Sequence, residues 1–211
     1  ASVVDLGNNF ATTEKDIVMM ANRLAAGGKL AGLTAPEILG LATAMSSVGI
    51  EAEAGGTAMT QTLTAIGNAV SLTTKDSADD LALIAKVAGT TSEEFQQAWK
   101  EKPAEALQSF IKGLNTAREK GANMDAILMK LGMTGVRQGN MLKSLALSSD
   151  KMSAAVNRSN QAWKENTALT NEANKRYETT ESQLKMFRNQ LTDIAIEFGG
   201  PLIKALREGL N

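Results

Sequence analysis

Neither cysteine nor histidine occurs among the 211 residues of the chain. These absences exclude disulfides, thiolate nucleophiles, histidine general bases and zinc sites built from either side chain. The sequence also lacks the glycine-rich loops that hold dinucleotides or nucleoside triphosphates. We therefore expect no catalytic residue, no metal site and no cofactor.

Charge of one sign is not in excess, because 22 basic residues stand against 23 acidic ones and give a net charge of −1. Such a balance provides no bulk attraction to nucleic acid or to an anionic membrane. No run approaches the roughly 18 apolar residues of a membrane-spanning helix, and no secretion signal opens the chain. The chain begins at Ala1 without a methionine, so we expect it to be a piece of a longer polypeptide.

Aromatic residues are scarce, at 4% of the chain, and proline occurs three times. Alanine, leucine, methionine, threonine and serine are abundant instead. This composition favours helices packed through small side chains over a β-sandwich, which needs valine, isoleucine and aromatic residues. The expected fold class is all-α.

Helix starts and stops can be placed along the sequence. Pro36, Pro103 and Pro201 each open an apolar-periodic segment, where the missing N–H costs nothing. Thr34–Glu37 and Thr91–Glu94 both have the Thr-x-x-Glu form of a capping box. Glycines follow several apolar or basic turns, where a left-handed residue ends a helix. These glycines are Gly27, Gly49, Gly89, Gly121, Gly132 and Gly199.

Between these positions, apolar residues recur at spacings of three and four, as on one face of a helix. The clearest stripes are Ile38, Leu41, Ala42 and Met45, then Met59, Leu63, Ile66 and Val70, then Leu81, Ile84, Ala85 and Ala88, and then Leu107, Phe110, Ile111 and Leu114. No segment alternates cleanly with period two. Residues 1–148 are therefore predicted to form a compact bundle of seven to nine short helices.

The sequence changes character after residue 148. Residues 149–198 contain neither proline nor glycine and are predicted to form one long helix that projects from the bundle, spanning about 75 Å at 1.5 Å per residue. Apolar residues spaced four and three apart give this helix a partly coiled-coil-like seam for self-association or for a partner chain, which Thr180 interrupts. The seam residues are Ala173, Tyr177, Leu184, Phe187, Leu191, Ile194 and Phe198. In residues 199–211, a Gly-Gly-Pro break precedes a short amphipathic helix.

Residues 91–103, TSEEFQQAWKEKP, combine acidic residues with two aromatics and could be an active site or the outside of a helix. With a cap at the start of the stretch, Phe95 and Trp99 share one helical face. Glu93 and Glu94 then fall in the first turn, where carboxylates favour the helix dipole. We interpret the stretch as structural.

Two other carboxylate pairs could form an acid/base pair or a cation site, but the sequence supports neither use strongly. Glu51 and Glu53 lie two residues apart, so on a helix they point to different faces, and no third oxygen ligand for calcium lies nearby. Asp79 and Asp80 are expected in the first turn of a helix.

The ten methionines either line an adaptable binding groove or fill gaps in a core short of aromatics. The candidates for such a groove are Met19, Met20, Met59, Met124, Met129 and Met133.

Four stretches together carry a resemblance to a known family. They are Gly32–Ile38 (GLTAPEI), Met45–Ala58 (MSSVGIEAEAGGTA), Phe95–Trp99 (FQQAW) with Pro103–Leu114, and Leu131–Arg137 (LGMTGVR) leading to Leu145 and Ala146. In their order and spacing they resemble the shared, non-repetitive helical domain of the tape-measure proteins of long-tailed bacteriophages and prophages. The likeness covers roughly residues 10–200, and members of that family are usually much longer than this chain.

The resemblance implies a structural virion protein that occupies the tail tube, helps to set tail length during assembly, and leaves with the genome at infection. It implies a location in the lumen of the virion tail, and in the bacterial cytoplasm during assembly. The implied partners are other copies of the chain or adjoining tape-measure sequence, the tail tube proteins and tail assembly chaperones. It implies no catalytic residue in this chain.

Two other classes of function stay open at this point. The segments Gly55–Val70 and Leu81–Gly89 are the least polar parts of the chain, which would suit a membrane-active helical protein delivered by the tail during infection. An enzyme is the third class, and the missing histidine, cysteine and cofactor loops oppose it.

The seam generates a first prediction. Replacing Leu184 and Leu191 together by Asp places charges on the seam, which should convert a self-associated chain to a monomer. Size-exclusion chromatography with light scattering measures the mass of both forms. A wild-type chain that is already a monomer would contradict the prediction.

Overall fold

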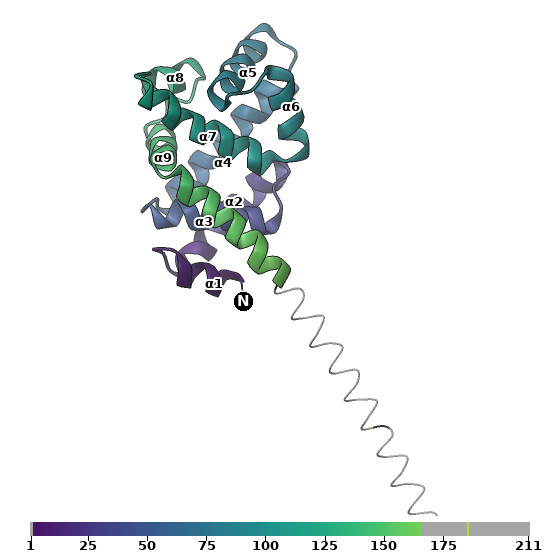
Figure 1. The fold of residues 1–211 in the computed structure, drawn as a ribbon, viewed down its shortest axis with the longest axis vertical. Coiled ribbons are helices and arrows are strands. Elements are labelled where there is room, and N and C mark those ends of the chain that lie inside the picture. The colour runs from purple at the N-terminus through teal and green to yellow at the C-terminus, as the bar shows by residue number, and fades with distance from the viewer. Residues whose placement is uncertain (1, 166–184, 186–211) are drawn as a thin grey trace, which may run out of the picture. The chain divides into compact units, whose positions relative to one another are not determined.

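α-Helices are the only regular secondary structure among the residues that the computed structural model describes, which are 2–165 and 185 (Figure 1). The labelled helices are α1 (Ser2–Asn9), α2 (Glu14–Leu30), α3 (Ala35–Ser47), α4 (Ala52–Ser71), α5 (Lys75–Ala88), α6 (Ser92–Glu101), α7 (Pro103–Glu119), α8 (Met124–Lys130) and α9 (Val136–Leu147). A further helix covers residues 149–165 and is named here the last described helix. The predictions of an all-α fold and of seven to nine short helices before residue 149 are confirmed.

The predicted helix starts follow from local chemistry. Pro36 and Pro103 occupy the first turns of α3 and α7, where no N–H is required. The Glu37 carboxylate accepts a hydrogen bond from the backbone N–H of Thr34 at 2.8 Å, as a capping box requires. Both predictions are confirmed, whereas Pro201 lies outside the described residues.

Of the six glycines predicted to end helices, four are confirmed, Gly27 is wrong, and Gly199 lies outside the described residues. Gly49, Gly89, Gly121 and Gly132 have left-handed backbones, with φ between 67° and 89°. Gly27 instead lies inside α2, where an added Cβ would meet the Thr60 side chain of α4 at 2.6 Å. Close packing between two helices, and not a turn, therefore requires glycine at position 27. The left-handed residue after α2 is Gly32.

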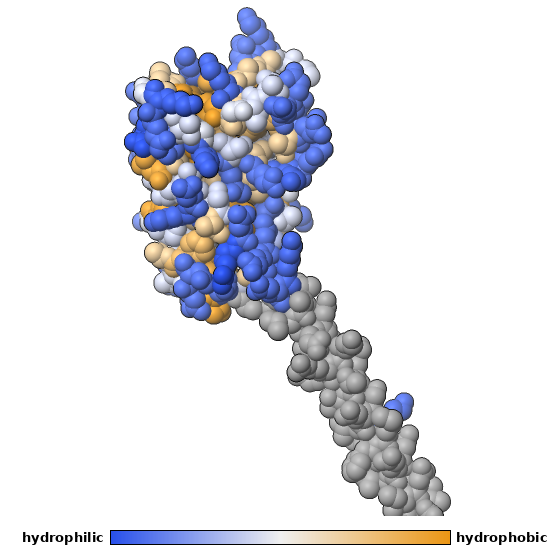
Figure 2. Space-filling view, viewed as in Figure 1, coloured by the Kyte–Doolittle hydropathy of each residue, from blue (hydrophilic) through white to orange (hydrophobic). Residues whose placement is uncertain are grey.

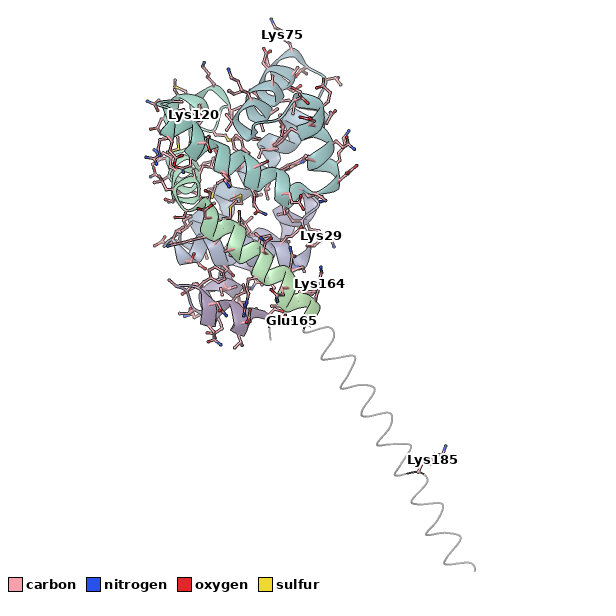
Figure 3. All side chains as sticks on the ribbon, viewed as in Figure 1. Lys29, Lys75, Lys120, Lys164, Glu165 and Lys185 are labelled. Carbon is pink, nitrogen blue, oxygen red and sulfur yellow. The ribbon has the colours of Figure 1, made fainter. Side chains whose placement is uncertain are left out.

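Helix α4 packs between a helix from earlier in the chain and helices from later in it. It packs against α2 on one side and against α5, α6 and α9 on the other, and Figure 1 shows it in the middle of these helices. Its predicted stripe is buried, from Met59 to Val70. The stripes of α3 and α7 are buried as well, while Leu81 and Ala88 of α5 are half-buried. Lysines such as Lys75 extend away from this core into solvent (Figure 3).

Glycines bring several helices into direct backbone contact. A Cβ on Gly113 of α7 would collide with the carbonyl oxygen of Val87 in α5. A Cβ on Gly40 of α3 would lie 2.5 Å from the Cα of Val156 in the last described helix. Contacts between side chains cannot substitute at these crossings, because no side chain fits between the backbones.

The last described helix belongs to the compact unit, which ends at Lys164. This differs from the predicted boundary at residue 148, since residues 149–164 pack onto the bundle. The buried residues of this helix are Ser149, Met152, Ala155, Val156, Ser159 and Ala162. They recur at helical spacing, but most of them are small, so the apolar periodicity of this segment is weak in the sequence. The predicted continuation of the helix beyond residue 165 lies outside the described residues, apart from Lys185.

Polar contacts attach this helix to the start of the chain. The Ser159 hydroxyl donates to the carbonyl oxygen of Pro36 at 2.6 Å. The Arg158 guanidinium donates to both carboxylate oxygens of Asp5 in α1, at 2.6 and 2.7 Å. These hydrogen bonds lower the pKa of Asp5. Because the pair is partly exposed, its contribution to stability is at most about 1 kcal/mol.

The glycine contacts generate a second prediction. Gly113→Ala should lower the free energy of unfolding by about 1–3 kcal/mol, because the methyl group forces α5 and α7 apart. Gly67→Ala is the matched control, since it also lies inside a helix but its Cβ would meet nothing within 4 Å. That change should raise the free energy of unfolding by about 0.5–1 kcal/mol. Urea denaturation followed by circular dichroism measures both, and equal effects would contradict the assignment.

Candidate functional site

The acidic stretch that begins α6 forms the predicted helix start and the predicted aromatic pair. The Thr91 hydroxyl accepts a hydrogen bond from the backbone N–H of Glu94 at 3.2 Å, and the Glu94 carboxylate accepts one from the N–H of Thr91 at 2.9 Å. Phe95 and Trp99 are buried and stacked, with ring centroids 6.4 Å apart. The Gln96 side chain donates to the carbonyl oxygen of Val70, which ties α6 to the end of α4. The carboxylates therefore start the helix while the aromatics hold it in the core.

A groove of about 670 Å³ lies between α2 and the start of α4 and is named here the α2–α4 groove. One wall is the first half of α2, and the other is the connection from α3 to α4 with the first turn of α4. Gly49, with its left-handed backbone, turns the chain between α3 and α4. Gly56 then lets α4 approach α2 so closely that a Cβ would collide with the Cβ of Arg23. Backbone geometry thus sets the width of the groove.

Charged residues of both signs line the α2–α4 groove. Glu51 and Glu53, which the sequence suggested as a weak pair on different faces, both line it, together with Asp16 and Arg23 of α2. The helical spacing does not apply to them, because Glu51 is the cap of α4 and lies outside the helix. Asp16 and Arg23 were missed in the sequence analysis, because about 30 residues separate them from the glutamates and only the fold brings them together. No group of three or more acidic residues among the described residues is placed to hold a metal ion. The arrangement offers hydrogen bonds and charge pairing to a polar segment of another chain.

The expectation that Asp79 and Asp80 lie in a first turn is wrong. Helix α5 begins at Lys75, with Thr74 as its cap, so the pair lies in the second turn. The Thr74 hydroxyl accepts a hydrogen bond from the backbone N–H of Ser77. Because this cap stabilises the first turn, α5 begins one turn earlier than expected. Burial raises the pKa of Asp80, and the neighbouring carboxylates of Asp76 and Asp79 raise it further.

The methionines mostly fill the core. Met20, Met59, Met124 and Met133 are buried, as the core interpretation predicts. Met19 and Met129 are exposed, at 44% and 66%. Met19 borders the α2–α4 groove, and Met129 borders a second groove between α8 and α9. Two of the six candidates are therefore available to a partner.

A buried hydrogen bond holds α9 to α4. The Gln138 side chain donates to the Thr62 hydroxyl at 3.1 Å, and the Thr62 hydroxyl donates to the carbonyl oxygen of Ala58 at 2.9 Å. No buried side-chain nitrogen or oxygen in the described part of the chain lacks a partner. These polar groups serve to align helices.

The predicted association seam cannot be placed on this fold. Tyr177, Leu184, Phe187, Leu191, Ile194 and Phe198 all lie outside the described residues. The seam therefore stays a prediction from the sequence.

Asp80 generates a third prediction. Because its pKa is raised in the folded protein, the ionised carboxylate costs stability at pH 7, and this cost disappears as the pH falls through that pKa. Asp80→Asn should therefore stabilise the protein at pH 7 by about 0.2–0.5 kcal/mol, the usual size of a like-charge effect at this helical spacing. Thermal unfolding at pH 7 and at pH 3 measures the difference. A gain of equal size at both pH values would contradict the electrostatic cause.

Comparison of the chain with models of protein families, with curated protein sequences and with solved structures found no match. Inferences about function therefore rest on the residues of this chain, on its fold and on the resemblance that its four stretches show.

Proposed function

We propose that this chain is a segment of the tape-measure protein of a bacteriophage or prophage tail. In this proposal it is a structural virion protein, which occupies the tail tube until genome ejection and helps to set the length of the tail. The observation that carries the proposal is the order and spacing of the four resembling stretches in the sequence.

The places of these stretches in the fold support the proposal. Gly32–Ile38 contains the left-handed glycine after α2 and the cap of α3. Met45–Ala58 contains the turn at Gly49 and the glycines that seat α4 on α2, and so it forms one wall of the α2–α4 groove. Phe95–Trp99 supplies the stacked aromatic pair, and Leu131–Arg137 contains the turn at Gly132 between α8 and α9. The resemblance thus falls on residues that determine helix ends and crossings.

A helical protein can measure length without any chemistry. Each residue of a continuous helix adds about 1.5 Å, so tube polymerisation can stop once the protein inside is covered. The 164 residues of the compact unit would span about 245 Å as a single helix. A compact chain of that size has a radius of gyration of only about 15 Å. We therefore assign the measuring role to continuous helix and not to the compact unit in its folded form.

The membrane-active alternative has less support. The segments that suggested it correspond to most of α4 and α5, and the apolar stripe of α4 faces the protein core. No helix in the described part of the chain is long and apolar enough to cross a bilayer. Leakage of dye from liposomes, at neutral and mildly acid pH, separates the two functions, because a tape-measure role does not require leakage by this chain.

The proposal generates a fourth prediction. In the phage or prophage that encodes this chain, an in-frame duplication of residues 166–198 should lengthen the tail by about 50 Å, if each residue adds about 1.5 Å. These residues lie outside the compact unit, so the duplication leaves its core intact. Electron microscopy of purified tails measures the length. A flexible Gly/Ser-rich insert of equal size at the same place is the control, and tails of unchanged length with the duplication would contradict the proposal.

A further inference from the structure

An open apolar groove lies between α8 and α9 and is named here the α8–α9 groove. Its volume is about 380 Å³, and its walls include Met129 and Met133 on one side and Val136 on the other. Met129 and Val136 are 66% and 78% exposed. Leu147 continues the face of α9 that carries Val136 and is 58% exposed. Figure 2 shows hydrophobic surface where α8 and α9 lie, at the left of the view.

The surroundings of this groove are basic. Residues 124–147 contain three basic side chains and one acidic side chain, Asp125. Asp125 accepts a hydrogen bond from Lys143 at 2.7 Å, and this pair lies on the groove wall. Lys130 and Arg137 directly follow the exposed Met129 and Val136, and neither forms an ion pair with another described residue. An apolar segment with acidic flanks would therefore complement the groove in both hydrophobicity and charge.

The sequence of the chain contains such a segment in residues 191–198, LTDIAIEF. Leu191, Ile194 and Phe198 recur at the spacing of one helical face. Asp193 and Glu197 are its only charged residues, and they are four residues apart. The three apolar residues also end the seam predicted from the sequence, whose partner was left open.

We propose that the α8–α9 groove binds residues 191–198 of a second copy of this chain. Leu191, Ile194 and Phe198 pack on the exposed apolar groups of the groove, and the two carboxylates pair with Lys130 and Arg137. Residues 166–190 contain neither proline nor glycine to turn the segment back, which favours a second copy over the same copy. This inference does not rest on the proposed function, because any helical protein with these two surfaces would associate in the same way.

The proposal generates a fifth prediction, a charge-swap experiment on the full chain. The groove variant carries Lys130→Glu with Arg137→Glu, and the segment variant carries Asp193→Lys with Glu197→Lys. Each variant alone should weaken self-association by about tenfold or more, because like charges then face one another. The variant with all four substitutions should return to within about threefold of the wild-type dissociation constant, since opposite charges face one another again. Sedimentation equilibrium at low salt measures these constants.

The controls separate a local effect from a general one. Lys75→Glu with Lys86→Glu makes the same change of net charge on α5, away from the groove, and should leave the dissociation constant unchanged. Circular dichroism of the groove variant should match the wild type, because Lys130 and Arg137 are exposed. The same measurement on the other variants checks that they fold. The proposal is overturned if the wild-type chain is a monomer at every concentration, or if the fourfold variant stays as weak as the single-surface variants. It is also overturned if the groove variant associates as the wild type does, which is the result expected of seam-to-seam pairing alone.

Discussion

The close approach of helices at glycine is the constraint on which this fold depends. With aromatics at 4% of the chain, the core cannot be filled by large rings, so the helices must approach one another closely. Gly56 seats α4 on α2, Gly113 seats α7 on α5, and Gly40 seats the last described helix on α3. Since α4 packs on α2 and also on α5, α6 and α9, its contact with α2 affects where these other helices lie, and it sets the width of the α2–α4 groove.

Features of the fold that depend on neighbouring residues were predictable from the sequence. The caps at Thr34 and Thr91 and the stacked pair Phe95–Trp99 follow from local hydrogen bonds and from helical periodicity. Features that depend on distant residues were not. Gly27 has the sequence context of a helix end, and only Thr60 of another helix shows why it stands inside one. Residues 149–164 are mostly polar, and their few buried side chains are mostly small. They pack on the bundle because Gly40 of α3 lets the two helix backbones come into contact.

Some residues of the candidate binding surfaces could be noted from the sequence, but their neighbours on those surfaces could not. Glu51 and Glu53 could be noted as neighbours in the sequence, but their groove partners Asp16 and Arg23 come from another helix. The methionines could be divided between core and surface only after the helices were oriented, because the same spacing fits both uses. A single sequence shows which residues are apolar, whereas exposure depends on which helix covers them.

The return of the last described helix to the beginning of the chain has a consequence for synthesis on the ribosome. Its contacts reach back from Val156 to Gly40, from Ser159 to Pro36 and from Arg158 to Asp5, over more than 110 residues in each case. The unit cannot close until these last residues have emerged, which takes roughly 8 to 30 seconds at a translation rate of about 5–20 residues per second. Until then, the side of α3 around Gly40 stays uncovered on the nascent chain, where it is open to chaperones or to neighbouring polypeptides.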